Sequence, residues 1–262
     1  MESPRERGAV GNSYFVCATP RTGSSLLLGL LHSTGVAGHP QAYFRSPDER
    51  LWAKRWRVRR TPEGDIDYGD YVRAALAAGR TDNGVFGAKL MWGNLDELVD
   101  KLGSVCRQLA GDELALLAAA FGRTRFVYLR RDDIVAQAVS WLRAEQTGTW
   151  YVGGNGEIGP GAVGTGGRPR FNAQAIADLV RVIHEHNVAW QEWFASHGIR
   201  PHVMRYEDLD GDSARATAQV LQSLGLELPP GRPLSPVTRH ARQADALNLE
   251  WARRFRAESG EG

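Results

Sequence analysis

Short apolar runs alternate with stretches of helical periodicity along the chain. Apolar runs bounded by turn residues predict four strands, at residues 14–18, 85–91, 125–129 and 202–206. Apolar positions three and four residues apart predict helices, at residues 24–32, 70–78, 95–109, 113–121, 134–146, 172–196 and 213–224. Because strands separated by helices form parallel sheets, we expect an α/β fold with a central parallel sheet flanked by helices.

Residues 20–25, Pro-Arg-Thr-Gly-Ser-Ser, lie between the first predicted strand and the first predicted helix. Gly23 lets the backbone approach a ligand, while hydroxyls, consecutive amides and the helix N-terminus attract an anion. A nucleoside-triphosphate P-loop needs a lysine after its last glycine. Here Arg21 precedes the glycine and no lysine follows it, which favours a metal-free phosphosulfate over ATP. The alternative is an ordinary helix start capped by Ser24 beside a surface arginine.

Charged and aromatic residues follow each of the predicted strands. In parallel sheets, ligands bind beyond the carboxyl ends of the strands, so these residues should converge on one cleft. They are Arg21, Lys89 with Trp92, Arg130 with Arg131, and Tyr206 with Glu207.

Two stretches do not fit a compact core. Residues 45–67 mix charges and prolines with bulky side chains such as Trp52 and Trp56, which predicts an excursion over the cleft. Residues 153–167 hold eight glycines in fifteen positions, so we expect a loop that is disordered in the free protein, or alternatively one that closes on a ligand. We predict one domain over residues 1–262 that carries both stretches.

Composition narrows the class of protein. The net charge of +2 gives no reason to expect a nucleic-acid partner. Cys17 and Cys106, in a predicted strand and a predicted helix, argue against a disulfide framework and favour the cytoplasm. No apolar stretch approaches the roughly 20 residues that span a bilayer, and residues 1–11 are polar rather than signal-like, so we expect no membrane partner.

Several short motifs in a fixed order resemble the sulfotransferase superfamily and, within it, the bacterial trehalose 2-sulfotransferase family. The resemblance implies a P-loop-like three-layer α/β fold that binds 3′-phosphoadenosine-5′-phosphosulfate (PAPS) and moves its sulfuryl group to an acceptor, usually a hydroxyl, without a metal. The motifs are Arg21-Thr22-Gly23-Ser24-Ser25, Thr34-Gly35-Val36-Ala37-Gly38 with Pro40-Gln41, Gly84-Val85-Phe86-Gly87-Ala88-Lys89-Leu90-Met91-Trp92, Gln137-Ala138-Val139-Ser140-Trp141 with Arg143, Gln146-Thr147, and Arg242-Gln243-Ala244-Asp245 with Glu250-Trp251.

Sulfuryl transfer, like phosphoryl transfer, requires the protein mainly to position reactants and to neutralise charge on the transferred and leaving oxygens. Lys89 ends a predicted buried strand, where an ammonium group needs an anionic partner. That partner is a sulfuryl or leaving-group oxygen or, alternatively, a structural carboxylate. The residues assigned to the 5′ end of the donor are Arg21, Thr22, Gly23, Ser24 and Ser25.

The resemblance implies a second anion site for the 3′-phosphate of the nucleotide, formed by Arg131 and Ser140. Their spacing is one position longer than in many cytosolic relatives, so either Arg130 or Arg131 could point inward, and Arg131 is preferred. Arg242 is expected to add a third cationic contact, the alternative being a surface salt bridge to Asp245.

The acceptor side departs from the family pattern. Where trehalose enzymes carry a glutamate base after the Pro-Gln pair, this chain has Ala42 after Pro40 and Gln41. His39 is the nearest replacement as general base, unless it is simply an exposed histidine in a turn. Pro20 also replaces a sugar-contacting glutamine. The two losses make trehalose an unexpected acceptor.

Aromatic residues suggest an aromatic-walled acceptor pocket next to these positions, although core burial is the alternative for each. A phenol needs less help from a base than an alcohol, which slightly favours a phenolic or otherwise activated acceptor. The aromatic candidates are Tyr43, Phe44, Trp52, Trp56 and Trp92.

The sequence thus predicts a cytoplasmic sulfotransferase that acts on a hydroxyl of a small metabolite, glycoside or phenol. One rival is a family member that binds the nucleotide but is catalytically weakened and has a regulatory or interaction role. The other is a P-loop small-molecule kinase. Trp141 and Trp150 could cover a homodimer contact, which core burial explains equally well.

Overall fold

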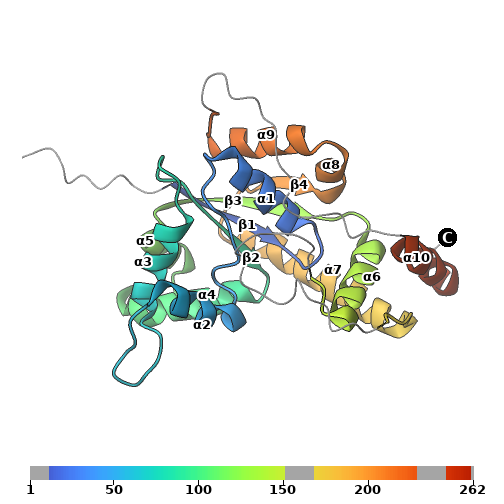
Figure 1. The fold of residues 1–262 in the computed structure, drawn as a ribbon, viewed down its shortest axis with the longest axis horizontal. Coiled ribbons are helices and arrows are strands. Elements are labelled where there is room, and N and C mark those ends of the chain that lie inside the picture. Colours follow the sequence, from blue (N-terminus) through green and yellow to red (C-terminus); the bar gives the residue numbers. More distant parts are fainter. Residues whose placement is uncertain (1–11, 151–167, 229–245, 261–262) are drawn as a thin grey trace, which may run out of the picture.

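The fold is built on one parallel sheet, which confirms the α/β prediction. The structure, a computed structural model, describes residues 12–150, 168–228 and 246–260. Its sheet contains four parallel strands in the order β2-β1-β3-β4 (Figure 1). The strands are β1 (Asn12–Ala18), β2 (Phe86–Met91), β3 (Arg123–Arg130) and β4 (His202–Arg205).

Helices connect and flank these strands. Each predicted helix is present, although the one expected at residues 95–109 divides into α4 and a 3-10 turn, η1. The sequence did not predict α2, α8 or α10. The helical elements are α1 (Ser24–Thr34), α2 (Ser46–Trp56), α3 (Tyr68–Gly79), α4 (Asn94–Val105), η1 (Arg107–Leu109), α5 (Glu113–Phe121), α6 (Ile134–Thr147), α7 (Ala173–Ser196), α8 (Tyr206–Gly211), α9 (Ser213–Leu224) and α10 (Ala246–Ser259).

Alternating side chains of β1 enter two different cores, one on each face of the sheet. Phe15 and Cys17 pack into a cluster rich in aromatic rings with residues of α2, α3, α4, α5 and α7. Tyr14 and Val16 pack on the other face against apolar residues of α1 and α9. In Figure 1, α1, α8 and α9 lie on one side of the sheet and α2 to α5 lie on the other, which gives the three layers.

Residues 45–67 are not a simple excursion, because they contain helix α2. Trp52 of this helix is buried in the aromatic core and stacks on Trp56 at 5.0 Å between ring centroids. Two carboxylates of α2 are also buried, and both have cationic partners. Asp48 pairs with Arg45 at 2.9 Å, and Glu49 pairs with Lys101 of α4 at 2.7 Å. These pairs explain how a charge-dense segment packs against the core.

Two sequence expectations fall outside the described residues: the glycine-rich loop at residues 153–167, and Arg242 with Asp245. None of the helices in the described ranges combines the length and apolar character that crossing a bilayer requires.

Candidate functional site

The loop between β1 and α1 (residues 19–23) turns sharply at the carboxyl end of the sheet. Arg21 and Gly23 both adopt left-handed backbone conformations, with φ of 69° and 80°. A Cβ on Gly23 would lie 2.6 Å from the Tyr206 ring, so only glycine fits without movement of that ring. Thr22 is buried, and its hydroxyl donates to the Thr19 carbonyl at 3.0 Å.

The N-terminus of α1 has the features of an anion site. Gly23 at the N-cap supplies no side-chain hydrogen bond, and the first turn contains no acidic residue. The first amides of a helix need acceptors, and the helix dipole favours a negative one. A phosphate or sulfate group at this position would provide those acceptors.

Arg21 links the loop to α6 and to the segment that follows this helix. Its Nε donates to the Ser140 hydroxyl of α6 at 3.0 Å, and its Nη1 donates to the carbonyl of Trp150. Burial and, after it, the charge of Arg131 lower the pKa of Arg21 to about 10; Tyr206 acts in the opposite direction, and the charge of Arg143 adds the smallest lowering effect. Arg21 therefore stays protonated at neutral pH among other guanidinium groups, an arrangement that a multiply charged anion would stabilise.

Gln137 ties α6 to the same loop. Its Nε2 donates to the Thr19 hydroxyl at 2.8 Å and to the Pro20 carbonyl at 2.7 Å. The side chain is fully buried, and its Oε1 makes no hydrogen bond. The sequence indicated Gln137 only as part of a motif. It did not indicate this positioning contact, because the contact joins residues 118 positions apart.

Of Arg130, the last residue of β3, and Arg131, which follows it, Arg131 is the one near Arg21. Its charge acts on Arg21, and its guanidinium lies 4.5 Å from the centre of the Tyr206 ring. Arg130 instead pairs with Asp132 at 3.2 Å. The structure thus brings Arg131, Ser140 and Arg21 to the same region.

Lys89 lies inside β2, two residues before its end, rather than closing the strand. It is in register with Val16, whose side chain enters the core beneath α1, so Lys89 faces the α1 side of the sheet. Its backbone amide donates to the Gln41 carbonyl at 2.9 Å. Gln41 and Ala42, both half-buried, therefore run beside β2 next to Lys89.

The structure corrects the expected position of His39. Its Nδ1 lies 3.2 Å from Nδ1 of His32, which is eight residues after Ser24 and so about 12 Å along α1 from the loop. A Cβ on the preceding Gly38 would meet the backbone of Val85 and Gly87, at the start of β2. Residues 38–41 run in the same direction as β2, which leaves His39 at the end of the sheet opposite the loop.

The aromatic candidates are mostly core residues, which corrects the expected aromatic wall. Phe44 is 1% exposed and packs against Phe15 and Phe121. Tyr43 and Trp52 are also buried in this cluster, so in this structure their rings have almost no surface for an acceptor. The remaining positions are less uniform: Pro40 is buried, whereas Pro20, Trp56 and Trp92 are half-buried, and Trp92 packs edge-on against Trp190 at 5.0 Å.

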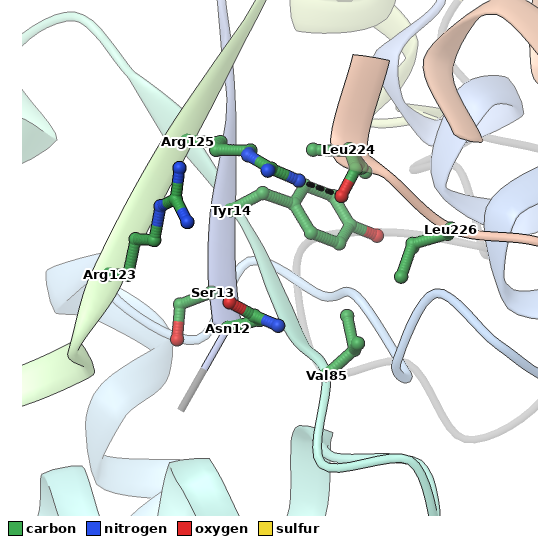
Figure 2. Close-up of a pocket in the computed structure, with 8 residues that line it drawn as sticks. All are labelled: Asn12, Ser13, Tyr14, Val85, Arg123, Arg125, Leu224 and Leu226. Carbon is green, nitrogen blue, oxygen red and sulfur yellow. Dashed lines mark hydrogen bonds between the residues drawn. The ribbon is translucent and has the colours of Figure 1, made fainter. Parts of the chain in front are cut away.

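A small hollow lies at the opposite, amino-terminal end of the strands (Figure 2). Arg125 crosses it and donates to the carbonyl of Leu224 at the end of α9. This contact caps a helix C-terminus and accounts for the arginine without a ligand. The hollow is lined by Asn12, Ser13, Tyr14, Val85, Arg123, Arg125, Leu224 and Leu226.

In the described ranges, no group of three or more histidine, cysteine, aspartate or glutamate side chains is arranged to hold a metal ion. The arginine-rich environment of the β1–α1 loop would itself repel a cation.

The parallel sheet and the strand–loop–helix unit define a P-loop-like α/β protein. The family model described as Stf0 sulphotransferase matches residues 13–258, so the chain belongs to the Stf0 sulfotransferase family.

Relatives of known activity cover nearly the whole chain. It is 32% identical to a trehalose 2-sulfotransferase of Mycobacterium tuberculosis and 31% identical to one of Mycolicibacterium smegmatis. Each match covers 94% of this chain and 95% of the relative. Among solved structures, a sulfotransferase from Alicyclobacillus acidocaldarius is similar over 96% of this chain and 93% of its own, with a TM-score of 0.48 and 12% identity.

Proposed function

We propose that this family member transfers the sulfuryl group of PAPS to a hydroxyl of a small metabolite, glycoside or phenol, without a metal. The observation that carries the proposal is the half-buried Arg21, which donates a hydrogen bond to Ser140 and lies near the charges of Arg131 and Arg143. A donor with a phosphosulfate at one end and a 3′-phosphate at the other provides the negative charge that this cluster needs.

The reaction moves one group and one proton. The acceptor oxygen bonds to sulfur, the bond between sulfur and the 5′-phosphate oxygen breaks, and the hydroxyl proton passes to a base or to solvent. We assign Arg21 and the first amides of α1 to the leaving 5′-phosphate, and Arg131 with Ser140 to the 3′-phosphate. Lys89 faces α1 from β2 and is assigned to charge on the transferred group.

The kind of acceptor that we propose follows from the absence of a general base at position 42. Ala42 cannot accept a proton, and His39 lies beside His32 at the other end of α1. An acceptor acidic enough to react with little help from a base, such as a phenol, fits this arrangement better than a sugar alcohol. Trehalose, the acceptor named for the mycobacterial relatives, is therefore not our proposed acceptor.

The test is a turnover assay with labelled PAPS against a panel of phenols, glycosides and sugars that includes trehalose. We expect transfer to at least one phenolic or other hydroxyl acceptor. Binding of adenosine 3′,5′-bisphosphate without any turnover would favour the alternative suggested by Ala42, a catalytically weakened nucleotide-binding protein. Thermal stabilisation by ATP with magnesium, but not by the bisphosphate, would favour a kinase.

A further inference from the structure

The guanidinium of Arg143 lies near the β1–α1 loop, and no contact with the donor has yet been assigned to it. Gln137, Ser140 and Arg143 follow one another at three-residue intervals on α6, so each is the surface neighbour of the one before it, one turn along the helix. The first contacts Thr19 and Pro20, and the second contacts Arg21. Arg143 continues this row, and its charge acts on Arg21.

Arg143 is held from the other side by α10. Its Nη1 donates to Oδ1 of Asn248 at 2.6 Å, and Asn248 is a buried polar residue, 7% exposed. Holding a long side chain in one orientation reduces the entropy that it would lose on meeting a ligand. The contact therefore preorganises a cation next to Arg21 and Ser140.

Helix α10 is anchored on α6 at two points. Arg256 pairs with Asp133, the residue that caps the start of α6, at 2.6 Å. Between the two polar contacts, Trp251 and Phe255 are buried with apolar residues of α6 and α7. Figure 1 shows α6 and α10 at the same end of the molecule. The helix is therefore a firm support for the Arg143 side chain.

We propose that Arg143 is a binding residue for the 3′-phosphate of the nucleotide, next to Ser140 and Arg131, and that Asn248 is its positioning residue. The proposal rests on the proposed function, because it takes the ligand to be the adenosine 3′,5′-bisphosphate part of the donor. It assigns α10 a role at the donor site through one side-chain contact.

The 3′-phosphate is favoured by the geometry of α6. Ser140 is the residue one turn before Arg143 on the same side, and a phosphate bound to its hydroxyl would lie within reach of a guanidinium three positions on. The 5′ end lies at the start of α1, where Gly23 and the first helical amides are the nearest donors. Guanidinium groups bind phosphates through paired hydrogen bonds, which suits the fixed Arg143.

The test is calorimetric titration of the full chain with adenosine 3′,5′-bisphosphate and, separately, with adenosine 5′-monophosphate, which lacks the 3′-phosphate. We expect Arg143→Ala to weaken the bisphosphate at least about tenfold, the loss typical of a charge-assisted contact, and to change the monophosphate less than about twofold. Asn248→Ala should weaken the bisphosphate about threefold or more, and the double variant should bind like Arg143→Ala alone.

Arg253→Ala is the matched control, because it removes an exposed arginine of α10 whose Nε donates to the Leu249 carbonyl of the same helix. Arg143→Lys retains the charge, and it provides a second variant if the alanine variant does not fold. Unchanged bisphosphate affinity in a folded Arg143→Ala would overturn the proposal, as would equal weakening of both ligands. Additive losses in the double variant would overturn the positioning role of Asn248. The two claims fail in different ways. If the wild-type protein bound no bisphosphate, the proposed function would fail; if the wild type bound it and Arg143→Ala bound it equally well, only the role of Arg143 would fail.

Discussion

At the residue scale, Arg21 joins the loop to α6. Its left-handed backbone costs about 1 kcal/mol or more in a non-glycine residue, and the surrounding contacts must offset this cost. Hydrogen bonds to Ser140 and to the Trp150 carbonyl hold the side chain in place. The loop is therefore organised before any ligand arrives, as electrostatic catalysis requires.

Gly23→Ala should destabilise the fold by about 1–3 kcal/mol, because the new Cβ would meet the Tyr206 ring and the backbone would be strained at positive φ. Gly111→Ala is the control, since it has a similar positive φ but open space around the position. Denaturant unfolding compares the two free energies of unfolding. An equal loss in both variants would show that the contact with Tyr206 costs nothing.

His39→Ala should leave kcat within about twofold of the wild type, because the imidazole lies beside His32, remote from the loop. His32→Ala should behave in the same way. Rates are compared on the best acceptor of the panel, with the folded state of each variant checked by circular dichroism. A loss of roughly 10²–10⁴ in kcat for His39→Ala alone would restore this residue as the general base.

At the element scale, α2 explains how a segment that reads as an excursion packs into the core. Its two buried carboxylates, Asp48 and Glu49, look solvated in the sequence, and the partner of Glu49 is Lys101, more than fifty positions away. Trp52 then completes an aromatic cluster with Tyr43 and Trp56. The helix is part of the domain core rather than a cover over the site.

Trp52→Ala should lower the free energy of unfolding by about 3–5 kcal/mol, the usual cost of removing a buried large aromatic side chain. The neighbouring Leu51, which is 53% exposed, is the control, and Leu51→Ala should change stability by less than about 0.5 kcal/mol. Chemical denaturation measures both. A fully stable Trp52→Ala would mean that α2 does not pack on the core in solution.

The sequence could predict features that depend on neighbouring residues, but not contacts between residues far apart in the chain. The four strands and most helices followed from local apolar periodicity, and the Arg21 loop followed from its composition next to a strand. The bond between Arg21 and Ser140 spans 119 positions and exists only because β1 and β3 are neighbours in the sheet. His39 was misplaced because nothing local indicates which way residues 38–41 run beside β2.

At the scale of the whole molecule, one cationic region lies where the carboxyl ends of β1 and β3 meet α6. Helix α10 supports this region from the other side of α6. Its charge comes from Arg21, Arg131 and Arg143, side chains that favour anions and repel metal ions. We therefore expect the proposed sulfuryl transfer to proceed without a divalent cation.

Chelation should therefore leave the rate of sulfuryl transfer unchanged. The measurement is the initial rate with labelled PAPS before and after treatment with an excess of EDTA, with added magnesium as the reverse control. A strict requirement for magnesium would contradict the metal-free mechanism and favour the kinase alternative.

The central claim is that the β1–α1 loop and the arginines around it bind the nucleotide of PAPS. Its most direct test is calorimetric titration of adenosine 3′,5′-bisphosphate into the wild type, Arg21→Ala and Arg131→Ala, with Arg130→Ala as control because Arg130 pairs with Asp132. We predict that each of the first two variants loses about 1.5–3 kcal/mol of binding free energy, as for charge-assisted hydrogen bonds, while the control binds like the wild type. Wild-type affinity in both Arg21→Ala and Arg131→Ala would contradict the account.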